Sequence, residues 1–176
     1  TSAANSAVTS YLTAKGKPSN ARDDFENDLM DPNKNSLLGY NLDAWDGYGV
    51  ERETILQSAL ALGKKLISLA GDTHNAWLGK LTDAQGKFIG TELACSSVSS
   101  PGLEGYLGIT SDPAKAIELA QAFSLLIDDL DYANLYKRGY LHVKFTMGSS
   151  VAEWRFVDNI ISDTYNITTE KTYTIS

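Results

Sequence analysis

The stretch LISLAGDTHNAW, residues 66–77, decides the fold that the sequence predicts. An apolar run over residues 66–70 stops at Gly71 and is followed by Asp72 and His74, whose side chains can both bind metal. A buried strand that ends in a glycine turn has this pattern, and α/β proteins place ligand sites at the carboxyl ends of such strands. Asp supplies hard oxygen atoms and His a borderline nitrogen, which suits a mixed metal site or a two-metal site. On spacing alone, a turn or capping role for Asp72 explains the pattern equally well.

Periodic segments on both sides of this strand predict an α/β protein. Upstream, residues 50–62 have the spacing of an amphipathic helix that ends at Gly63. Downstream, residues 77–82 and 87–95 predict two strands joined by a hairpin loop. Asp112 and Pro113 then suit the N-cap and first position of another helix. The buried stripe predicted for that helix consists of Ile117, Ala120, Phe123, Ile127 and Leu130.

The two ends of the chain have different patterns. Residues 139–147 and 150–158 predict a C-terminal β-hairpin, because apolar and polar side chains alternate along them. His142 falls on the polar face of this hairpin, where we expect an exposed imidazole. Residues 171–175 predict a last edge strand. Residues 1–40 are rich in Ala, Ser, Asn, Asp and Lys, and we expect them to be largely irregular apart from a short helix around Ser6–Ala14 that ends near Gly16.

Four segments, in order along the chain, resemble those of one enzyme family. GDTHNAW, residues 71–77, is similar to the GDxHxxW signature of the PhoD-like alkaline phosphatases, a branch of the calcineurin-like metallophosphatases. Residues 43–48, DAWDGY, with Arg52, resemble the family segment DxWDGYxxxR. SVSSPG, residues 97–102, is similar to its S-x-[ST]-S-x-G loop. RGY at residues 138–140 and EWRF at residues 153–156 resemble its closing hairpin, so the resemblance covers residues 35 to 160.

The resemblance implies a fold, an activity and a location. The fold is part of a calcineurin-like α/β sandwich, with a mixed sheet, flanking helices and a C-terminal β-hairpin. The activity is that of a phosphoesterase, of the alkaline phosphatase or phosphodiesterase type, in which a binuclear metal centre activates water. The metals implied are Fe³⁺ and Ca²⁺, with Asp72 and His74 as catalytic metal ligands. The location implied is the periplasm or the outside of the cell.

The same resemblance predicts that the chain is one part of a larger catalytic domain. In the family, the metal centre is built mainly from the N-terminal half of that domain, and no counterpart of its ligand motifs precedes Asp72. We therefore expect residues 1–176 to form the C-terminal portion of a single domain, with the missing N-terminal half as its partner. The rival interpretation is a catalytically inactive structural or interaction fragment, because two candidate ligands do not hold a binuclear site.

Four further residues are candidates for contact with a phosphate ester. Arg52 suits bidentate binding of phosphate, and Trp45 and Tyr48 can close the wall of a pocket. Packing roles for the two aromatic residues, and a surface role for Arg52, stay open. For Asn75, a loop-holding Asx role is the alternative to phosphate contact. The serines of residues 97–100 indicate backbone scaffolding, since no nucleophile elbow or partner base accompanies them.

Composition narrows the remaining possibilities. The chain has 176 residues, 43% of them hydrophobic and 21% charged, which is ordinary for a globular protein with a real core. A formal net charge of −7 argues against a nucleic-acid-binding surface, which needs a basic face. It does not exclude a phosphate substrate, because bound cations invert the local field. No apolar stretch reaches membrane-spanning length. Cys95 is the single cysteine, so no internal disulfide forms, and a small buried apolar role suits it.

Overall fold

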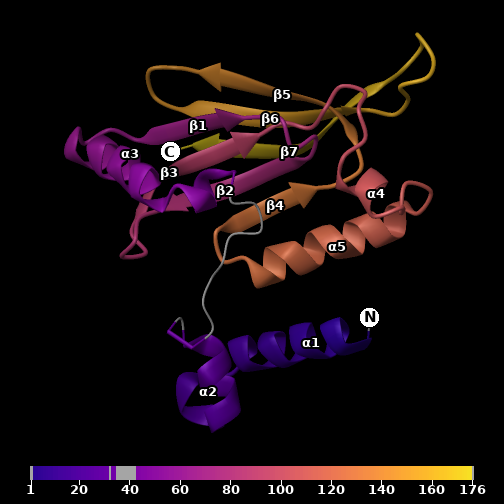
Figure 1. Cartoon of the computed structure of the whole chain (residues 1–176). Helices are drawn as coiled ribbons and strands as arrows, with labels where there is room; N and C mark the ends of the chain where they lie inside the picture. The colour runs from indigo at the N-terminus through magenta and orange to yellow at the C-terminus, as the bar shows by residue number, and fades with distance from the viewer. Residues whose placement is uncertain (1, 32, 35–42, 176) are drawn as a thin grey trace. The chain divides into compact units, whose positions relative to one another are not determined.

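The computed structural model of the protein describes residues 2–31, 33–34 and 43–175 (Figure 1). The chain divides into two compact units, Thr1–Arg52 and Glu53–Ser176. The boundary falls within the helix α3, Gly49–Ala61. Whether both units belong to a single catalytic domain stays a prediction.

The first unit is helical. Its elements are α1 (Ser2–Gly16), η1 (Ser19–Ala21), α2 (Asp24–Met30) and η2 (Trp45–Gly47). A capping box starts α2: the Glu26 amide donates to the Asp23 side chain at 2.8 Å, and the Asp23 amide donates to the Glu26 carboxylate at 3.0 Å. Arg22 Nε donates to the Ala14 carbonyl at 2.7 Å and joins the end of α1 to the start of α2. The short helix expected around Ser6–Ala14 lies within α1, but the described part of residues 1–40 is more helical than predicted, because α1 starts earlier and α2 follows it. Residues 1, 32 and 35–40 lie outside the described residues.

The second unit contains a four-stranded mixed sheet. Its strands are β1 (Leu66–Ala70), β2 (Ala76–Thr82), β3 (Phe88–Ala94) and β4 (Leu130–Asn134). Their order is β1-β3-β2-β4, with β1 parallel to β3 and the other pairs antiparallel. The predicted strand at residues 66–70 and the predicted pair after it are confirmed, whereas β4 is a strand that the sequence patterns did not reveal.

A three-stranded antiparallel sheet faces the first one. It consists of β5 (Arg138–Phe145), β6 (Ser150–Val157) and β7 (Ile167–Ile175), in the order β5-β6-β7. The core lies between the two sheets and is formed by Ala76, Leu78, Leu93, Ala152, Trp154, Phe156 and Ile175. Trp154 is fully buried, and its indole Nε1 donates to the Ala94 carbonyl at 2.8 Å, which ties the sheets together. The predicted C-terminal hairpin and the final edge strand are confirmed.

Helices flank the four-stranded sheet. α5 (Pro113–Leu126) lies beside β4 (Figure 1), and the rings of Phe123 and Trp77 approach with centroids 6.3 Å apart. Asp112 caps α5 as predicted. The predicted buried stripe is partly wrong: Ala116 and Ala120 are buried, while Ile117 is 44% exposed. α4 (Leu103–Tyr106) is a single turn in the loop before α5.

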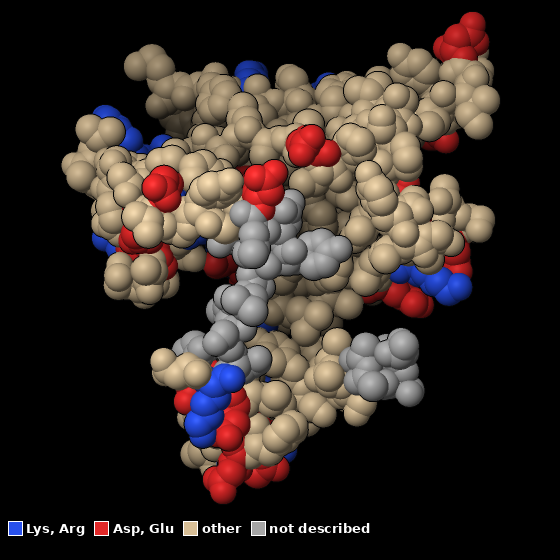
Figure 2. Space-filling view, in the orientation of Figure 1, with Lys and Arg blue, Asp and Glu red and all other residues tan. Residues whose placement is uncertain are grey.

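These layers confirm the predicted fold class, a mixed α/β arrangement with flanking helices and a C-terminal antiparallel sheet. Within the described residues, no helix has the length and apolar character needed to cross a membrane. On the face shown in Figure 2, the Lys and Arg side chains lie at separate points and form no continuous basic surface. This agrees with the net negative charge of the chain.

Candidate functional site

The loop at residues 71–75 crosses one end of the four-stranded sheet. It connects β1 to β2, which run in opposite directions with β3 between them. Neighbouring strands lie about 4.8 Å apart, so five residues must reverse the chain and cross roughly 10 Å. Asp72 and His74 adopt left-handed conformations in this loop, with φ of 66° and 59°. Such conformations cost about 1 kcal/mol or more for a residue with a side chain, and they persist where surrounding contacts impose them.

Asp72 and His74 therefore lie where the sequence predicted them, just past the carboxyl end of β1. Asp72 is exposed and His74 is half-buried. Between them, Thr73 accepts a hydrogen bond from the indole Nε1 of Trp77 at 2.9 Å, which anchors the loop to β2. Their role as metal ligands stays a prediction.

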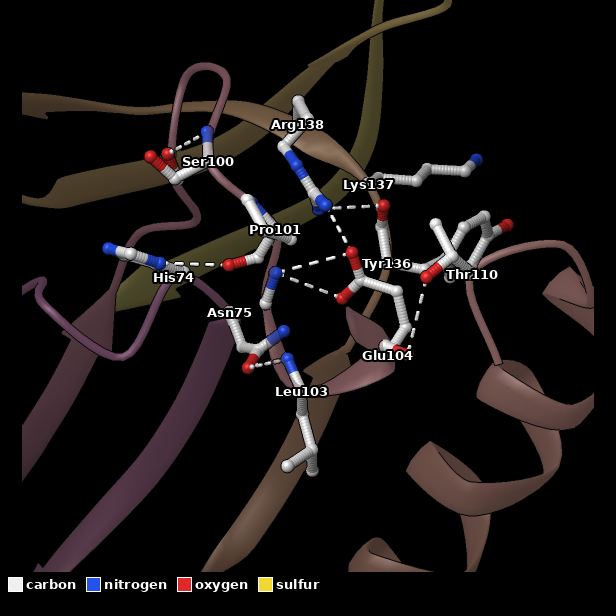
Figure 3. Close-up of polar contacts among 12 residues, drawn as sticks. His74, Asn75, Ser100, Pro101, Leu103, Glu104, Thr110, Tyr136, Lys137 and Arg138 are labelled. Atoms are coloured by element: carbon white, nitrogen blue, oxygen red, sulfur yellow. Dashed lines mark hydrogen bonds and ion pairs between the residues drawn. The ribbon is translucent and has the colours of Figure 1, made fainter. Parts of the chain in front are cut away.

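The His74 ring is held by the backbone of a second loop. His74 Nδ1 lies 2.9 Å from the Pro101 carbonyl oxygen (Figure 3). Because a carbonyl oxygen only accepts, Nδ1 must carry the proton in this bond. In the neutral ring, Nε2 then has a free lone pair, and Figure 3 shows this nitrogen pointing away from the loop. Metal-binding histidines in proteins are commonly oriented in this way, with one nitrogen on a backbone carbonyl and the other on the metal.

The second loop, residues 97–104, is braced by its own polar groups. Ser97 Oγ accepts hydrogen bonds from the amides of Ser99 and Ser100, at 3.2 and 2.8 Å. The Ser97 amide donates to the His74 carbonyl at 3.4 Å, and the Gly139 amide donates to the Ser97 carbonyl at 3.0 Å. The serines therefore act as scaffolding, as predicted, and they join the candidate site loop to the start of β5.

Asn75 is built into the contact between the two loops. Its side chain is 2% exposed, and its Oδ1 accepts a hydrogen bond from the Leu103 amide at 3.1 Å. A Cβ at Gly102 would lie 2.3 Å from Asn75 Nδ2, so any other residue there would force the buried Asn75 side chain to shift. The contact matches the loop-holding alternative for Asn75. Phosphate contact by Asn75 stays a prediction.

A buried ion pair closes this network. The Glu104 carboxylate, 2% exposed, accepts the Gly102 amide at 3.1 and 3.2 Å from its two oxygens. It also pairs with Nη2 of Arg138, which is 9% exposed, while Arg138 Nη1 donates to the Tyr136 carbonyl at 2.8 Å. The sequence interpretation did not single out Glu104. The signal available in the sequence was that Glu104 follows the Ser/Pro/Gly loop at residues 97–102 and that Arg138 lies in another of the segments that resemble the family.

Trp45, Tyr48 and Arg52 belong to the first unit. Trp45 and Tyr48 are each 49% exposed, and the Tyr48 hydroxyl donates to Asp43 Oδ1 at 3.3 Å. The Arg52 amide donates to the Tyr48 carbonyl at 2.9 Å, at the start of α3. Their predicted contact with a phosphate ester is not tested by these positions.

The second histidine lies in a different setting. His142 is on β5, 46% exposed, with Nδ1 3.1 Å from Glu153 Oε2. Glu153 also pairs with Arg155, and the hydrogen bonds from Arg155 and then His142 hold the pKa of Glu153 below its usual value. The exposed position predicted for His142 is confirmed.

The donor set around Asp72 and His74 can be stated for the described residues alone. Within residues 2–31, 33–34 and 43–175, no group of three or more His, Cys, Asp or Glu side chains is close enough to hold a metal ion. An exposed carboxylate and an oriented imidazole on one strained loop nevertheless suit two ligands of a shared oxygen and nitrogen site.

Comparison with known proteins places this chain in a family. The family model described as PhoD-like phosphatase matches residues 5–154. A solved structure described as "Structure of PhoD" is similar in fold, with a TM-score of 0.59 and 20% sequence identity over 77% of this chain. The match covers 25% of that chain, so this chain spans about a quarter of its length. No curated protein matches the chain. Because the family model matches most of the sequence, the chain belongs to the PhoD-like phosphatase family.

Proposed function

We propose that this chain is part of a phosphoesterase of the alkaline phosphatase or phosphodiesterase type, in which Asp72 and His74 are catalytic metal ligands. The observation that carries the proposal is the hydrogen bond from His74 Nδ1 to the Pro101 carbonyl, which leaves the Nε2 lone pair available on the same short loop that carries the exposed Asp72. Family membership supports the reaction class. Both residues have strained left-handed backbone conformations, and such strain is often found at functional sites, which also supports the proposal.

The donor atoms suit the proposed binuclear pair of Fe³⁺ and Ca²⁺. The Asp72 carboxylate offers the oxygen atoms that Ca²⁺ prefers, and the His74 imidazole offers a nitrogen that suits iron. When bound, such ions activate water and stabilise the charge that develops on a transferring phosphoryl group. We propose that the other ligands come from the N-terminal half of a longer catalytic domain, because no group of three or more candidate ligands lies together within the described residues.

Substrate contacts are assigned to four residues. Arg52 binds the phosphate group through its two parallel N–H donors, and Trp45 and Tyr48, both about half exposed, cover the organic part of the ester. Asn75 is the fourth of these residues, and its Oδ1 also supports the loop by accepting the Leu103 amide. The proposed location of the enzyme is the periplasm or the outside of the cell.

A second candidate function is favoured for the chain by itself. With two candidate ligands in the described residues, the isolated chain is a structural or interaction fragment without turnover. Hydrolysis of p-nitrophenyl phosphate and its bis ester should be measured for the isolated chain and for a longer protein that includes the rest of the catalytic domain. Activity only in the longer protein supports both proposals; equal activity in the isolated chain contradicts the proposal that the site is shared.

His74→Ala tests the metal assignment directly. In the longer, metal-loaded protein we expect at least about a hundredfold loss of turnover, because the loss of one ligand weakens the water-activating centre. His142→Ala is the matched control, since it removes the other histidine of this sequence from an exposed strand. Near-normal turnover of His74→Ala after metal removal and defined reloading would refute the assignment.

A further inference from the structure

We propose that the buried Glu104–Arg138 pair is a positioning device for the His74 imidazole. It acts through one peptide group, the one between Pro101 and Gly102. The N–H of this peptide group, on Gly102, donates to the Glu104 carboxylate at 3.1 and 3.2 Å. Its C=O, on Pro101, accepts from His74 Nδ1 at 2.9 Å. Figure 3 shows these contacts as a continuous series from Arg138 to His74.

Because a peptide group is planar, the two hydrogen bonds that it makes are coupled to each other. A trans peptide group is rigid and its N–H and C=O point in opposite directions. When Glu104 fixes the N–H of Gly102, it therefore also fixes the direction of the Pro101 carbonyl. That carbonyl is the acceptor that decides which nitrogen of His74 carries the proton.

The device is stiff because both charges are buried. Glu104 is 2% exposed and Arg138 is 9% exposed, so each charge depends on the other for compensation. Arg138 is also tied to the Tyr136 carbonyl at 2.8 Å, which anchors the pair at the start of β5. From the other side, Asn75 Oδ1 accepts the Leu103 amide and holds the same loop. Hydrogen bonds in such a series polarise one another in surroundings of low dielectric constant.

Glu104 and Arg138 are thus positioning residues and do not bind substrate or metal themselves. The effect on catalysis rests on the proposed function of His74. The prediction for the tautomer of the His74 ring does not rest on that function, because the tautomer can be measured on the 176-residue chain without metal. The two proposals can therefore fail separately.

The test uses the ¹⁵N-labelled chain and two-bond ¹H–¹⁵N correlations of its histidine rings, at a pH where both rings are neutral. The chain has two histidines, so His142→Ala assigns both sets of signals. In the wild-type chain we expect His74 to be mainly protonated at Nδ1. In Glu104→Gln, which keeps the shape but loses the charge, the ratio of Nδ1–H to Nε2–H at His74 should fall by about tenfold, the worth of one charge-assisted hydrogen bond. His142 should not change.

Arg138→Lys is the second variant. It keeps the charge but loses the planar guanidinium, so the His74 ratio should shift in the same direction by a smaller factor. A wild-type ring protonated mainly at Nε2 would overturn the inference without any variant. So would an unchanged His74 ratio in a folded Glu104→Gln chain. If the ratio responds but the longer protein has no phosphatase activity, the positioning role stands and the proposed function fails.

Discussion

The two histidines of this chain show how differently one side chain can be used. His74 lies on a strained crossing loop, and its Nδ1 meets a backbone carbonyl that other groups hold in place. His142 lies on an exposed strand, and its Nδ1 meets the side chain of Glu153. A backbone carbonyl cannot titrate or change rotamer, whereas a surface carboxylate can do both. The first setting fixes a tautomer and presents a lone pair; the second is a contact between two side chains at the surface.

The difference between the two settings also lies in what supports each contact. The peptide group of the Pro101 carbonyl is held by a buried ion pair, Glu104–Arg138, through the Gly102 amide. Glu153 is instead paired with Arg155, whose side chain is about a third exposed, so water can take the place of either partner. Buried pairs are costly to break from one side, and exposed pairs are worth little. This contrast gives predictions of decreasing size.

The largest effect is expected from Arg138→Ala. It leaves the Glu104 carboxylate buried without its partner, so the free energy of unfolding should fall by about 3–5 kcal/mol. Urea unfolding followed by far-UV circular dichroism measures this loss. Arg155→Ala is the matched control and should have a much smaller effect, because its partner Glu153 remains open to water. Similar losses in both variants would remove the contrast between the two settings.

A smaller effect of opposite sign is expected from Asp72→Gly. Glycine adopts positive φ without a side-chain clash, so the free energy of unfolding should rise by about 1 kcal/mol. In the longer protein the same change should lower metal affinity, because it removes the carboxylate that we propose as a ligand. His142→Gly, in an extended strand, should instead destabilise the chain. A destabilised Asp72→Gly chain would show that the Asp72 side chain supports the loop.

The smallest effect concerns the pH dependence of stability around Glu153. Its pKa is lowered in the folded chain, so the unfolded chain binds more protons between this lowered pKa and the usual value near 4.5. Its contribution is therefore fully present above that usual value and is lost as the pH falls through the lowered pKa. Glu153→Gln should make the free energy of unfolding fall less steeply as the pH is lowered. Urea unfolding measured at several pH values from about 3 to about 6 checks this. An unchanged profile would mean that water has replaced both contacts.

The sequence predicted the parts of the fold that repeat a simple pattern. The apolar run at residues 66–70 ends in a glycine turn, and residues 139–158 alternate in polarity, so both elements were found. Residues 130–134, LDYAN, carry neither pattern, and β4 was missed because its place in the sheet is set by pairing with β2. In α5 the predicted stripe was right at Ala120 but wrong at Ile117, which stays partly exposed while small Ala116 packs inward. Ile127 and Leu130, also predicted for this stripe, lie beyond the end of the helix.

One further feature was visible in the sequence but was outweighed by composition. The capping box of Asp23 and Glu26 signals a helix, yet the polar residues around it suggested an irregular segment. In the candidate site, Asp72 and His74 could be proposed from one short motif. Glu104 and Arg138 could not be paired, because they are 34 residues apart and only the folded sheets bring them together.

The strand order also has a consequence for the way in which the candidate site forms during folding. β2 and β3 are joined by a short loop and can pair locally, whereas β1 is added on the far side of β3. Local hairpins form in microseconds, and contacts between distant segments follow more slowly. In pulse-labelling hydrogen exchange, we expect the Ser97 amide, which bonds the His74 carbonyl, to become protected after the amides of the β2–β3 pair. The crossing loop thus takes its shape late, on strands that are already paired.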